Sequence, residues 1–435
     1  MGHIIQNFDA LAENELRRDA LELAEVGYEA ISVGNALRRK IHIENDALRI
    51  DAKNYPLALS EQAGRRRIFF VGIGKCALVA AKAIEEILGD QLTGGIAIDV
   101  SPLEQNLKKI ETYIGTHPLP SEENERATKR VLEFLSELGE DDLVIFLISG
   151  GGSTLLCSYD SPMTSTDESV LFKSLTAQGA SIQDMNTVRK HTSRARGGWL
   201  ARAAYPAEVV SLIVSDVPGN DIQFISSGPT IQDSSTIDDA KEVLERYKVA
   251  VPENTTFIET PKEEKYFEQV TNILFLTSRD ALSAMKDEAT RRGYATAIVD
   301  EQFTGEAREV ARAIAEKLHE TPEKTALFYA GESTVTITQN AGVGGRNQEM
   351  ALAALEYLNP DELILPFASD GHDNTDAAGA IGDSVSREHA LAHDLSIEES
   401  LNAHRAYDFF STIGDAICTG YTRSNVSDII IALKK

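Results

Sequence analysis

The feature that most constrains the fold is an apolar run that ends in three glycines. Residues 143–148 read LVIFLI, and Ser149 leads directly into Gly150, Gly151 and Gly152. A run that is apolar on both faces is typical of a central strand in a parallel sheet covered by helices. Glycines at its carboxyl end let the backbone turn sharply and present N–H groups to an anion such as phosphate or carboxylate. Ligands of open α/β sheets bind at this end of the strands, although a tight turn without a ligand is the alternative.

Strand and helix patterns alternate along the rest of the chain. Further strands are expected at 67–71, 96–100, 208–214, 273–277, 296–299, 326–330, 334–338, 363–369 and 428–433. Helices are expected at 8–39, 75–88, 121–138, 181–204, 279–292, 305–318 and 346–357. This alternation predicts a doubly wound α/β sheet. The letters GEST between 326–330 and 334–338 predict a hairpin, and therefore a second sheet that is mixed.

The length of 435 residues favours two domains over one. A Pro- and Glu-rich stretch at 250–266 marks the expected boundary, with one domain at 1–260 and the other at 261–435.

Composition restricts the partners. A formal net charge of −26 argues against a nucleic-acid or anionic-membrane surface. The three cysteines, Cys76, Cys157 and Cys418, form no metal or redox spacing, which suits a reducing compartment. The N-terminus lacks the apolar core of a signal peptide, and no run reaches the length of a membrane span. We therefore expect a cytoplasmic protein, and leave open whether it forms a homo-oligomer.

A lysine follows glycines where a helix is expected to begin. Residues 72–77 read GIGKCA, which matches the degenerate dinucleotide pattern GxGxxA, with Asp99 at the end of the next strand. Lys75 counts against that interpretation, because a cation near a helix N-terminus opposes the helix dipole. An anionic ligand would explain it, and a lysine that reaches into solvent is the alternative.

The same arrangement recurs in the second half. Gly344 and Gly345 precede Arg346 and Asn347 at the start of an expected helix. The planar guanidinium fork suits phosphate or carboxylate. One such cation in each domain fits an anionic ligand, and an arginine paired with a nearby acid is the alternative.

The segment 186–201 is basic in an otherwise acidic chain. It contains five basic or potentially basic groups: Arg189, Lys190, His191, Arg194 and Arg196. On one continuous helix Arg189, Ser193 and Arg196 would share a face, and Lys190 and Arg194 would be an i,i+4 pair of like charge. Either a bound anion or neighbouring carboxylates would offset the charge. Asn186 near the start is a substrate contact or only a helix cap.

Carboxylates follow two of the expected strands. Asp216 comes after 208–214, and Asp370 and Asp376 come after 363–369. At these strand ends an aspartate can hold Mg²⁺ together with substrate phosphates, or accept a proton from a hydroxyl. Ordinary Asp/Gly turn chemistry is the alternative for any single one.

Taken together and in order, these motifs resemble the MOFRL-type glycerate 2-kinases. The resemblance runs from about residue 8 to the C-terminus. It rests on GIGKCA (72–77), THPLPSEEN (116–124), SGGGSTLL (149–156), NTVRKHTSRARGG (186–198), SDVPGND (215–221), SSGPT (226–230), GESTVT (331–336), GGRNQEMAL (344–352) and SDGHDNTDAAGAIGD (369–383). It implies a larger Rossmann-like N-terminal domain and a smaller α/β domain, with the active site in the cleft between them.

The resemblance also implies a reaction, the transfer of phosphoryl from ATP to the C2 hydroxyl of D-glycerate with Mg²⁺, giving 2-phosphoglycerate and ADP. Lys75 and Arg346 match the family's catalytic cations, and Asp216 is the expected catalytic carboxylate. Expected substrate or phosphate contacts are Ser149, Gly150, Gly151, Gly152, Ser153, Asn186, Arg189, Lys190, Gly344, Gly345 and Asn347. Expected metal ligands are Asp216, Asp370 and Asp376.

Two stretches depart from the family pattern. The family's closing TGPTGTNVND is TGYTRSNVSD at 419–428 here, with Tyr421 for proline and Arg423 for glycine. The family's KHLSxIKGG is KHTSRARGG, in which Arg196 keeps the positive charge.

Two other classes of function remain open. GxGxxA alone would favour an NAD(P)H-dependent hydroxypyruvate reductase, which needs no ATP. A non-catalytic ligand-binding protein would explain the loops without requiring both cations and the carboxylates.

Overall fold

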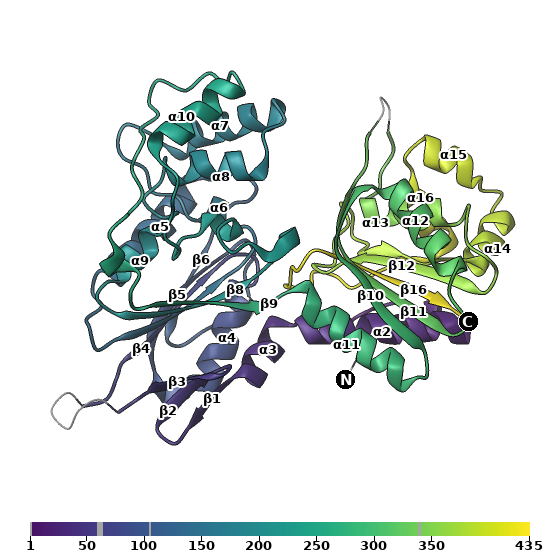
Figure 1. The fold of residues 1–435 in the computed structure, drawn as a ribbon, viewed down its shortest axis with the longest axis horizontal. Helices are drawn as coiled ribbons and strands as arrows, with labels where there is room; N and C mark the ends of the chain where they lie inside the picture. The colour runs from purple at the N-terminus through teal and green to yellow at the C-terminus, as the bar shows by residue number, and fades with distance from the viewer. Residues whose placement is uncertain (1, 59–63, 104–105, 338–340) are drawn as a thin grey trace. The chain divides into compact units, whose positions relative to one another are not determined.

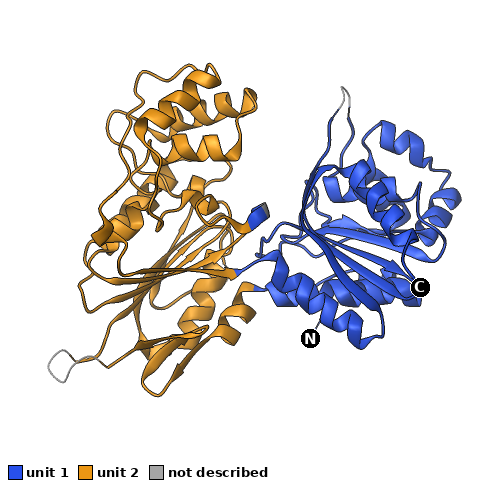
Figure 2. Cartoon of the chain, in the orientation of Figure 1, with its two compact units in different colours: residues 1–32, 216–219, 276–435 blue, residues 33–215, 220–275 orange. Residues whose placement is uncertain are grey.

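A computed structural model of the protein describes residues 2–58, 64–103, 106–337 and 341–435. The chain divides into two compact units, which Figure 2 colours separately. Unit 1 contains residues 1–32, 216–219 and 276–435, and unit 2 contains residues 33–215 and 220–275. Within the described ranges, no helix is both long and apolar enough to cross a membrane.

Unit 2 is built on a six-stranded sheet. Its strands are β4 (Ile68–Ile73), β5 (Leu92–Asp99), β6 (Ile110–Ile114), β7 (Leu143–Ile148), β8 (Glu208–Val214) and β9 (Val270–Leu276), in the order β6-β5-β4-β7-β8-β9. Counted along the chain this order is 3-2-1-4-5-6, as in doubly wound Rossmann folds. β4 pairs in parallel with β5 and β7, and every residue of β4 and β7 is buried, as the apolar runs predict. The strand order reverses between β4 and β7, where such sheets bind ligands.

The helices of unit 2 are α3 (Val33–Lys40), α4 (Ala77–Leu88), α5 (Glu122–Leu135), α6 (Gly152–Leu155), α7 (Ser165–Ala177), α8 (Ile182–Lys190), α9 (Trp199–Ala204) and α10 (Ile237–Arg246). α4 packs against β4 and β5, and α9 packs against β8, whereas α7, α8 and α10 form a group away from the sheet (Figure 1). α7, α8 and α10 share a small core of their own, which includes Leu171, Val188 and Leu244. A three-stranded antiparallel sheet, β1 (Ile41–Glu44), β2 (Ala47–Ile50) and β3 (Lys53–Pro56), was not predicted.

The prediction of one helical stretch at 181–204 is wrong. α8 ends at Lys190 and α9 begins only at Trp199, and Gly197 and Gly198, just before α9, have φ of 58° and 88°. These left-handed conformations cannot continue a right-handed helix. The shared helical face and the i,i+4 pair expected for the basic segment therefore do not form.

Unit 1 contains the predicted mixed sheet. Its longer strands are β10 (Ala295–Glu306), β11 (Thr325–Thr334), β12 (Glu362–Ala368) and β16 (Asp428–Lys434), and its short ones are β13 (Gly379–Ala380), β14 (Gly382–Asp383) and β15 (Ala416–Ile417). β10 and β11 are parallel, whereas β16 is antiparallel to both β11 and β12. The helices are α1 (Phe8–Leu11), α2 (Glu15–Ile31), α11 (Ser278–Arg291), α12 (Ala307–His319), α13 (Arg346–Ala354), α14 (Ser384–Ala392), α15 (Ile397–Asn402) and α16 (Ala406–Ile413). In Figure 1, α2 and α11 lie on one face of the sheet and α12 and α13 on the other.

The prediction of a hairpin between 326–330 and 334–338 is also wrong. β11 continues through Thr334 and stays paired with β10, although the last predicted strand residue, 338, lies outside the described residues. Gly331 is needed for close packing rather than for a turn, because a Cβ there would lie 2.2 Å from the carbonyl oxygen of Phe303. The register of β10 against β11 shifts next to this position.

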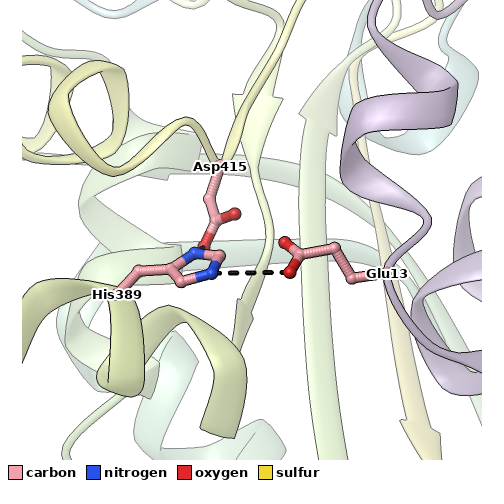
Figure 3. A group of neighbouring side chains, drawn as sticks. All are labelled: Glu13, His389 and Asp415. Atoms are coloured by element: carbon pink, nitrogen blue, oxygen red, sulfur yellow. Dashed lines mark ion pairs between the residues drawn. The ribbon is translucent and has the colours of Figure 1, made fainter. Parts of the chain in front are cut away.

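The N-terminal segment belongs with the C-terminal half, contrary to the expected boundary. Arg17 on α2 is fully buried and donates hydrogen bonds of 2.8 Å to both Asp383 and Asp415. The Tyr28 hydroxyl donates to the carbonyl of Ala368. These bonds tie residues 1–32 to unit 1, and the last change of unit along the chain comes at 275/276 rather than at 260/261. Figure 3 shows Asp415 with its neighbours Glu13 and His389.

Candidate functional site

In unit 2, two loops meet at the carboxyl ends of β4 and β7. The Ser149 amide donates to the carbonyl of Ile73 at 2.9 Å, and the Lys75 amide donates to the carbonyl of Gly150 at 3.0 Å. The glycine loop and the lysine turn are therefore joined by backbone hydrogen bonds. Lys75 precedes Cys76, the N-cap of α4, so it lies just outside the helix rather than in its first turn.

The glycines of these loops permit very close packing. A Cβ on Gly74 would lie 2.2 Å from Ser149 Oγ, and one on Gly152 would lie 2.2 Å from Ser226 Oγ. Gly151 has φ of 86°, a conformation that favours glycine. Gly151 and Gly152 are thus required by the local geometry, whether or not a ligand binds.

A histidine that the sequence did not single out lies against the loop. A Cβ built on Gly151 would lie 3.4 Å from His117 Cδ2 and 3.3 Å from Lys75 Cγ. Partial burial, followed by the positive charges of Lys75 and Arg189, lowers the pKa of His117 to about 4. His117 follows β6, whose exposed alternating residues gave no clear strand signal.

Arg189 is a buried cation whose charge is only partly offset. Its guanidinium lies 4.0 Å above the ring of Phe172, and Nε is 3.5 Å from Glu168 Oε1. Nε has no hydrogen-bond partner, and Glu168 also pairs with Arg196. Burial lowers the pKa of Arg189 to about 10 in spite of Glu168. A site of this kind suits an incoming carboxylate or phosphate.

A chain of hydrogen bonds joins α8 to the glycine loop. Ser153 Oγ lies 2.9 Å from Ser227 Oγ, which donates to Asn186 Oδ1 at 2.7 Å. Asn186 is therefore connected to the loop through Ser227. Its amide oxygen is occupied by that bond.

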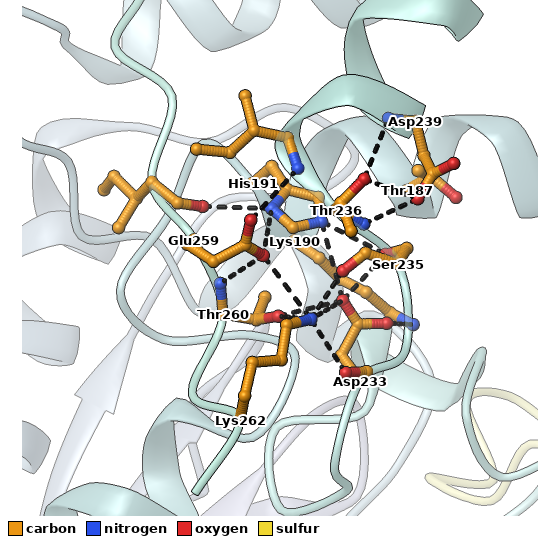
Figure 4. Close-up of polar contacts among 12 residues, drawn as sticks. Thr187, Lys190, His191, Asp233, Ser235, Thr236, Asp239, Glu259, Thr260 and Lys262 are labelled. Carbon is orange, nitrogen blue, oxygen red and sulfur yellow. Dashed lines mark hydrogen bonds and ion pairs between the residues drawn. The ribbon is translucent and has the colours of Figure 1, made fainter.

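Lys190 lies in a different network. Its ammonium is 3.0 Å from the buried carboxylate of Asp233, which also accepts from Ser235 and Thr260 (Figure 4). The adjacent His191 is fully buried, with its ring nitrogens against the carbonyl of Ile258 and the hydroxyl of Ser235. We therefore leave Lys190 out of the proposed substrate contacts, because its charge is already paired in a buried network.

The acid expected of a dinucleotide site is also occupied. Asp99 is fully buried and accepts from the backbone amides of Leu78, Val100 and Ser101. A Rossmann dehydrogenase uses the acid at this position to bind a ribose hydroxyl. Here the carboxylate stabilises the turn instead.

In unit 1, Arg346 is the first residue of α13 and pairs with two carboxylates. Its Nε donates to Asp428 at 2.5 Å, and its Nη1 contacts Glu332. Although burial acts in the opposite direction, these acids raise the pKa of Arg346 above its usual range. The alternative considered for Arg346, an acid partner, is thus present. Its side chain nevertheless remains about one third exposed.

Asp373 caps the same helix and was not predicted. Its carboxylate accepts from the backbone amides of Asn347 and Gln348 at 3.2 and 2.8 Å. The Asn347 side chain is fully buried and contacts Asp373 as well, so it is not exposed to a ligand. A Cβ on Gly345 would lie 2.0 Å from the Asp373 carbonyl oxygen, which explains one of the two glycines.

Residues 19–258 match a domain of unknown function (DUF4147), and residues 325–428 match the MOFRL family. Glycerate 2-kinase of Pyrococcus horikoshii is 32% identical over 440 residues, which cover 96% of this chain and 97% of that protein. The chain belongs to the glycerate 2-kinase family.

A crystal structure and a differently named relative add to this. The glycerate kinase structure from Thermotoga maritima superposes with a TM-score of 0.84 at 32% identity, covering 96% of this chain and 99% of that one. A putative hydroxypyruvate reductase of Agrobacterium vitis is 37% identical over 84% of this chain and 86% of its own length.

The stretch that departs from the glycerate 2-kinase pattern still forms a defined turn. Arg423, which replaces the family's glycine, has φ of 57°. The left-handed conformation explains the family's glycine, and the arginine adopts it in this chain. The Thr422 hydroxyl donates to the carbonyl of Ser369, and the Ser424 hydroxyl donates to the carbonyl of Ile31.

The three aspartates expected to bind metal in this glycerate 2-kinase family member do not form one cluster among the described residues. Asp370 accepts from the His372 amide, Asp376 is exposed and accepts from the Tyr407 hydroxyl, and Asp216 lies 3.5 Å from Asn425 Nδ2. A Mg²⁺ ion bound mainly by substrate phosphates needs only one or two carboxylates, which half-buried Asp216 and Asp370 could supply.

One other group of side chains has spacing suited to a metal. In the part of the chain that the structure describes, it consists of Glu13, His389 and Asp415. Both carboxylate oxygens of Asp415 already accept from Arg17. We interpret this group as part of the Arg17 ion-pair network.

Asp373 gives a testable pH dependence. Burial raises its pKa from 3.8 to about 7, in part opposed by the two backbone amides. The folded protein therefore retains this proton more strongly than the unfolded chain, and the resulting stabilisation is lost as the pH rises through about 7. Asp373→Asn should flatten the dependence of unfolding temperature on pH between about 4 and 7. The matched control is Asp287→Asn at an exposed position of α11, and equal slopes in the two variants would contradict the prediction.

Proposed function

We propose that this protein transfers the γ-phosphoryl group of ATP to the C2 hydroxyl of D-glycerate, giving 2-phosphoglycerate and ADP. The observation that carries the proposal is the position of Lys75 beside the glycine loop, at the strand reversal between β4 and β7, with the charge of Arg189 acting on the adjacent His117. Phosphoryl transfer depends on positioning and on neutralising charge, which is what such a set of cations supplies. We propose glycerate as the substrate because relatives of this chain are named glycerate 2-kinase and glycerate kinase.

Each group in unit 2 has a distinct role in this proposal. Arg189 binds the glycerate carboxylate, because its planar fork is buried and its Nε lacks a hydrogen-bond partner. Lys75 stabilises negative charge on the transferring group. The loop from Ser149 to Ser153 fixes the position of these anions, and Asn186 supports it through Ser227.

Unit 1 supplies the second cation. Arg346 would exchange part of its pairing with Glu332 for a phosphate oxygen, and buried Asp428 would keep its guanidinium oriented. Gly344 and Gly345 line a pocket at this helix start together with Arg346. In this proposal Lys75 and Arg346 both neutralise charge on the phosphate groups during the transfer.

In this proposal, aspartate carboxylates bind the metal ion. Asp216 and Asp370 would hold Mg²⁺ together with ATP oxygens, with Asp376 adding a water-mediated contact. When bound, Mg²⁺ neutralises charge on the phosphates. Asp216 is the carboxylate that we expect to matter most for catalysis.

One assay tests the reaction and its main alternative. The protein is incubated with ATP, Mg²⁺ and D-glycerate, and the product is identified by phosphorus NMR, with L-glycerate as the stereochemical control. We expect 2-phosphoglycerate from D-glycerate only. Oxidation of NADH with hydroxypyruvate, without a need for ATP, would support the reductase instead. Binding without turnover in either assay would support a ligand-binding protein.

A further inference from the structure

His117 lies against Gly151 of the glycine loop, the same residue that Lys75 lies against. A Cβ on Gly151 would lie 3.8 Å from His117 Nε2 and 3.3 Å from the Lys75 side chain, so both side chains flank this α-carbon. The residue belongs to the connection between β6 and α5, which is attached to the loop region because Thr154 Oγ1 donates to the carbonyl of Pro118. The imidazole is thereby placed beside the anion-binding loop.

Its environment differs from that of other histidines in the protein. His191 has both ring nitrogens within hydrogen-bond distance of protein oxygens and no exposure. His372 and His42 each have a ring nitrogen close to a backbone carbonyl. Across the described ranges, no protein hydrogen bond engages either ring nitrogen of His117, which is partly exposed. Both nitrogens are therefore available to a ligand.

The charges facing this ring are positive. They are Lys75, from the turn between β4 and α4, and Arg189, from α8. Together with partial burial they lower the pKa of His117, so the ring is neutral near pH 7 and has a lone pair to accept a proton. A neutral imidazole beside two cations is suited to receive a proton from a substrate held by those cations.

We propose that His117 is the general base of the phosphoryl transfer, an inference that rests on the proposed function. As the C2 oxygen of glycerate bonds to the γ-phosphorus, its proton moves to a nitrogen of His117. The bond from the γ-phosphorus to the bridging oxygen of ADP breaks, and ADP leaves with that electron pair. The imidazolium then releases its proton to water.

Substrate binding makes this base stronger. The glycerate carboxylate and the ATP phosphates bring negative charge to Lys75 and Arg189, which offsets the two positive charges that face His117. The pKa of His117 therefore rises in the ternary complex toward the ordinary histidine value, where general bases are most effective at neutral pH.

The test compares His117→Gln with His42→Gln, an exposed histidine of β1 in the same unit. For His117→Gln we expect kcat to fall about 10²- to 10³-fold, with KM for glycerate within a few-fold of the wild-type value. In plots of rate against pH, the wild-type kcat should begin to fall on the acid side at a higher pH than kcat/KM does. In His117→Gln this acid-side fall of kcat should be absent. A kcat within threefold of wild type, or an unchanged acid-side fall, would overturn the proposal.

A second measurement does not depend on turnover. Nitrogen-15 NMR of labelled histidine, assigned with His117→Gln, gives the pKa of His117 with and without D-glycerate and a non-hydrolysable ATP analogue. We expect a low value in the free protein that rises by at least one unit on binding, and an unchanged value would contradict the proposal. A wild-type chain that does not phosphorylate glycerate overturns the proposed function and this inference together. An active wild type with an unaffected His117→Gln variant overturns this inference alone.

Discussion

Replacing Lys75 by alanine is expected to lower kcat for glycerate phosphorylation by about a thousandfold, with the fold intact. The side chain flanks Gly151 next to His117, in the loop pair at the strand reversal. The ammonium would act on charge that develops in the transition state, so kcat should fall more than KM rises. Steady-state kinetics give the two constants, and thermal unfolding confirms that the variant is folded.

The matched control for this prediction lies in the neighbouring helix. Lys82→Ala removes a lysine of α4 whose nearest acid is Glu86 on the same helix, so its activity should stay within twofold of wild type. Lys75→Arg keeps the charge with a different shape and should recover part of the lost rate. Near-normal turnover by Lys75→Ala would exclude a catalytic role for this lysine.

Replacing Arg17 by methionine is expected to destabilise unit 1 by about 3–5 kcal/mol. The guanidinium is fully buried and binds Asp383 and Asp415 through both sides of its fork. Without it, two carboxylates that are at most 2% exposed would lose their counter-charge. Native-state hydrogen exchange of amides in β16 measures the effect in unit 1. Fluorescence of Trp199, the chain's single tryptophan, follows unit 2 separately.

The adjacent arginine provides the control. Arg18 occupies the next position of α2 and is exposed, so Arg18→Met should change stability by less than about 0.5 kcal/mol. Equal exchange rates in the Arg17→Met and Arg18→Met variants would show that the buried ion pairs do not stabilise the unit.

Sequence patterns predicted the central strands that are buried on both faces and missed the more exposed β6. β7 and β8 were found because nearly all their residues are buried and apolar. β6 was missed because only one of its five residues is buried. The false hairpin at 331–334 has a different cause. Gly331 permits β10 and β11 to approach closely, and the sequence alone does not distinguish such a glycine from one that permits a turn.

In the candidate site, residues with a local sequence signal were predicted, whereas residues placed by contacts remote in sequence were missed. Lys75 and the glycine loop could each be predicted, because each signal is a short run of consecutive residues. His117 was missed because its position depends on contact with Gly151, which is remote in sequence. Lys190 was assigned to the substrate because its partner, Asp233, lies 43 positions away in the chain. Charge pairing across such distances cannot be inferred from one sequence.

The attachment of α2 to unit 1 has a consequence for synthesis on the ribosome. Arg17 is made well before its partners Asp383 and Asp415, which lie 366 and 398 positions later. Unit 2 can complete its sheet as soon as β9 has emerged, whereas α2 must wait until these two aspartates have been made. Contacts at such separation are slow to form, so α2 lacks these partners while all of unit 2 is being synthesised. A gene fragment that begins at Leu276 would encode an unfinished unit, lacking the helix that carries Arg17.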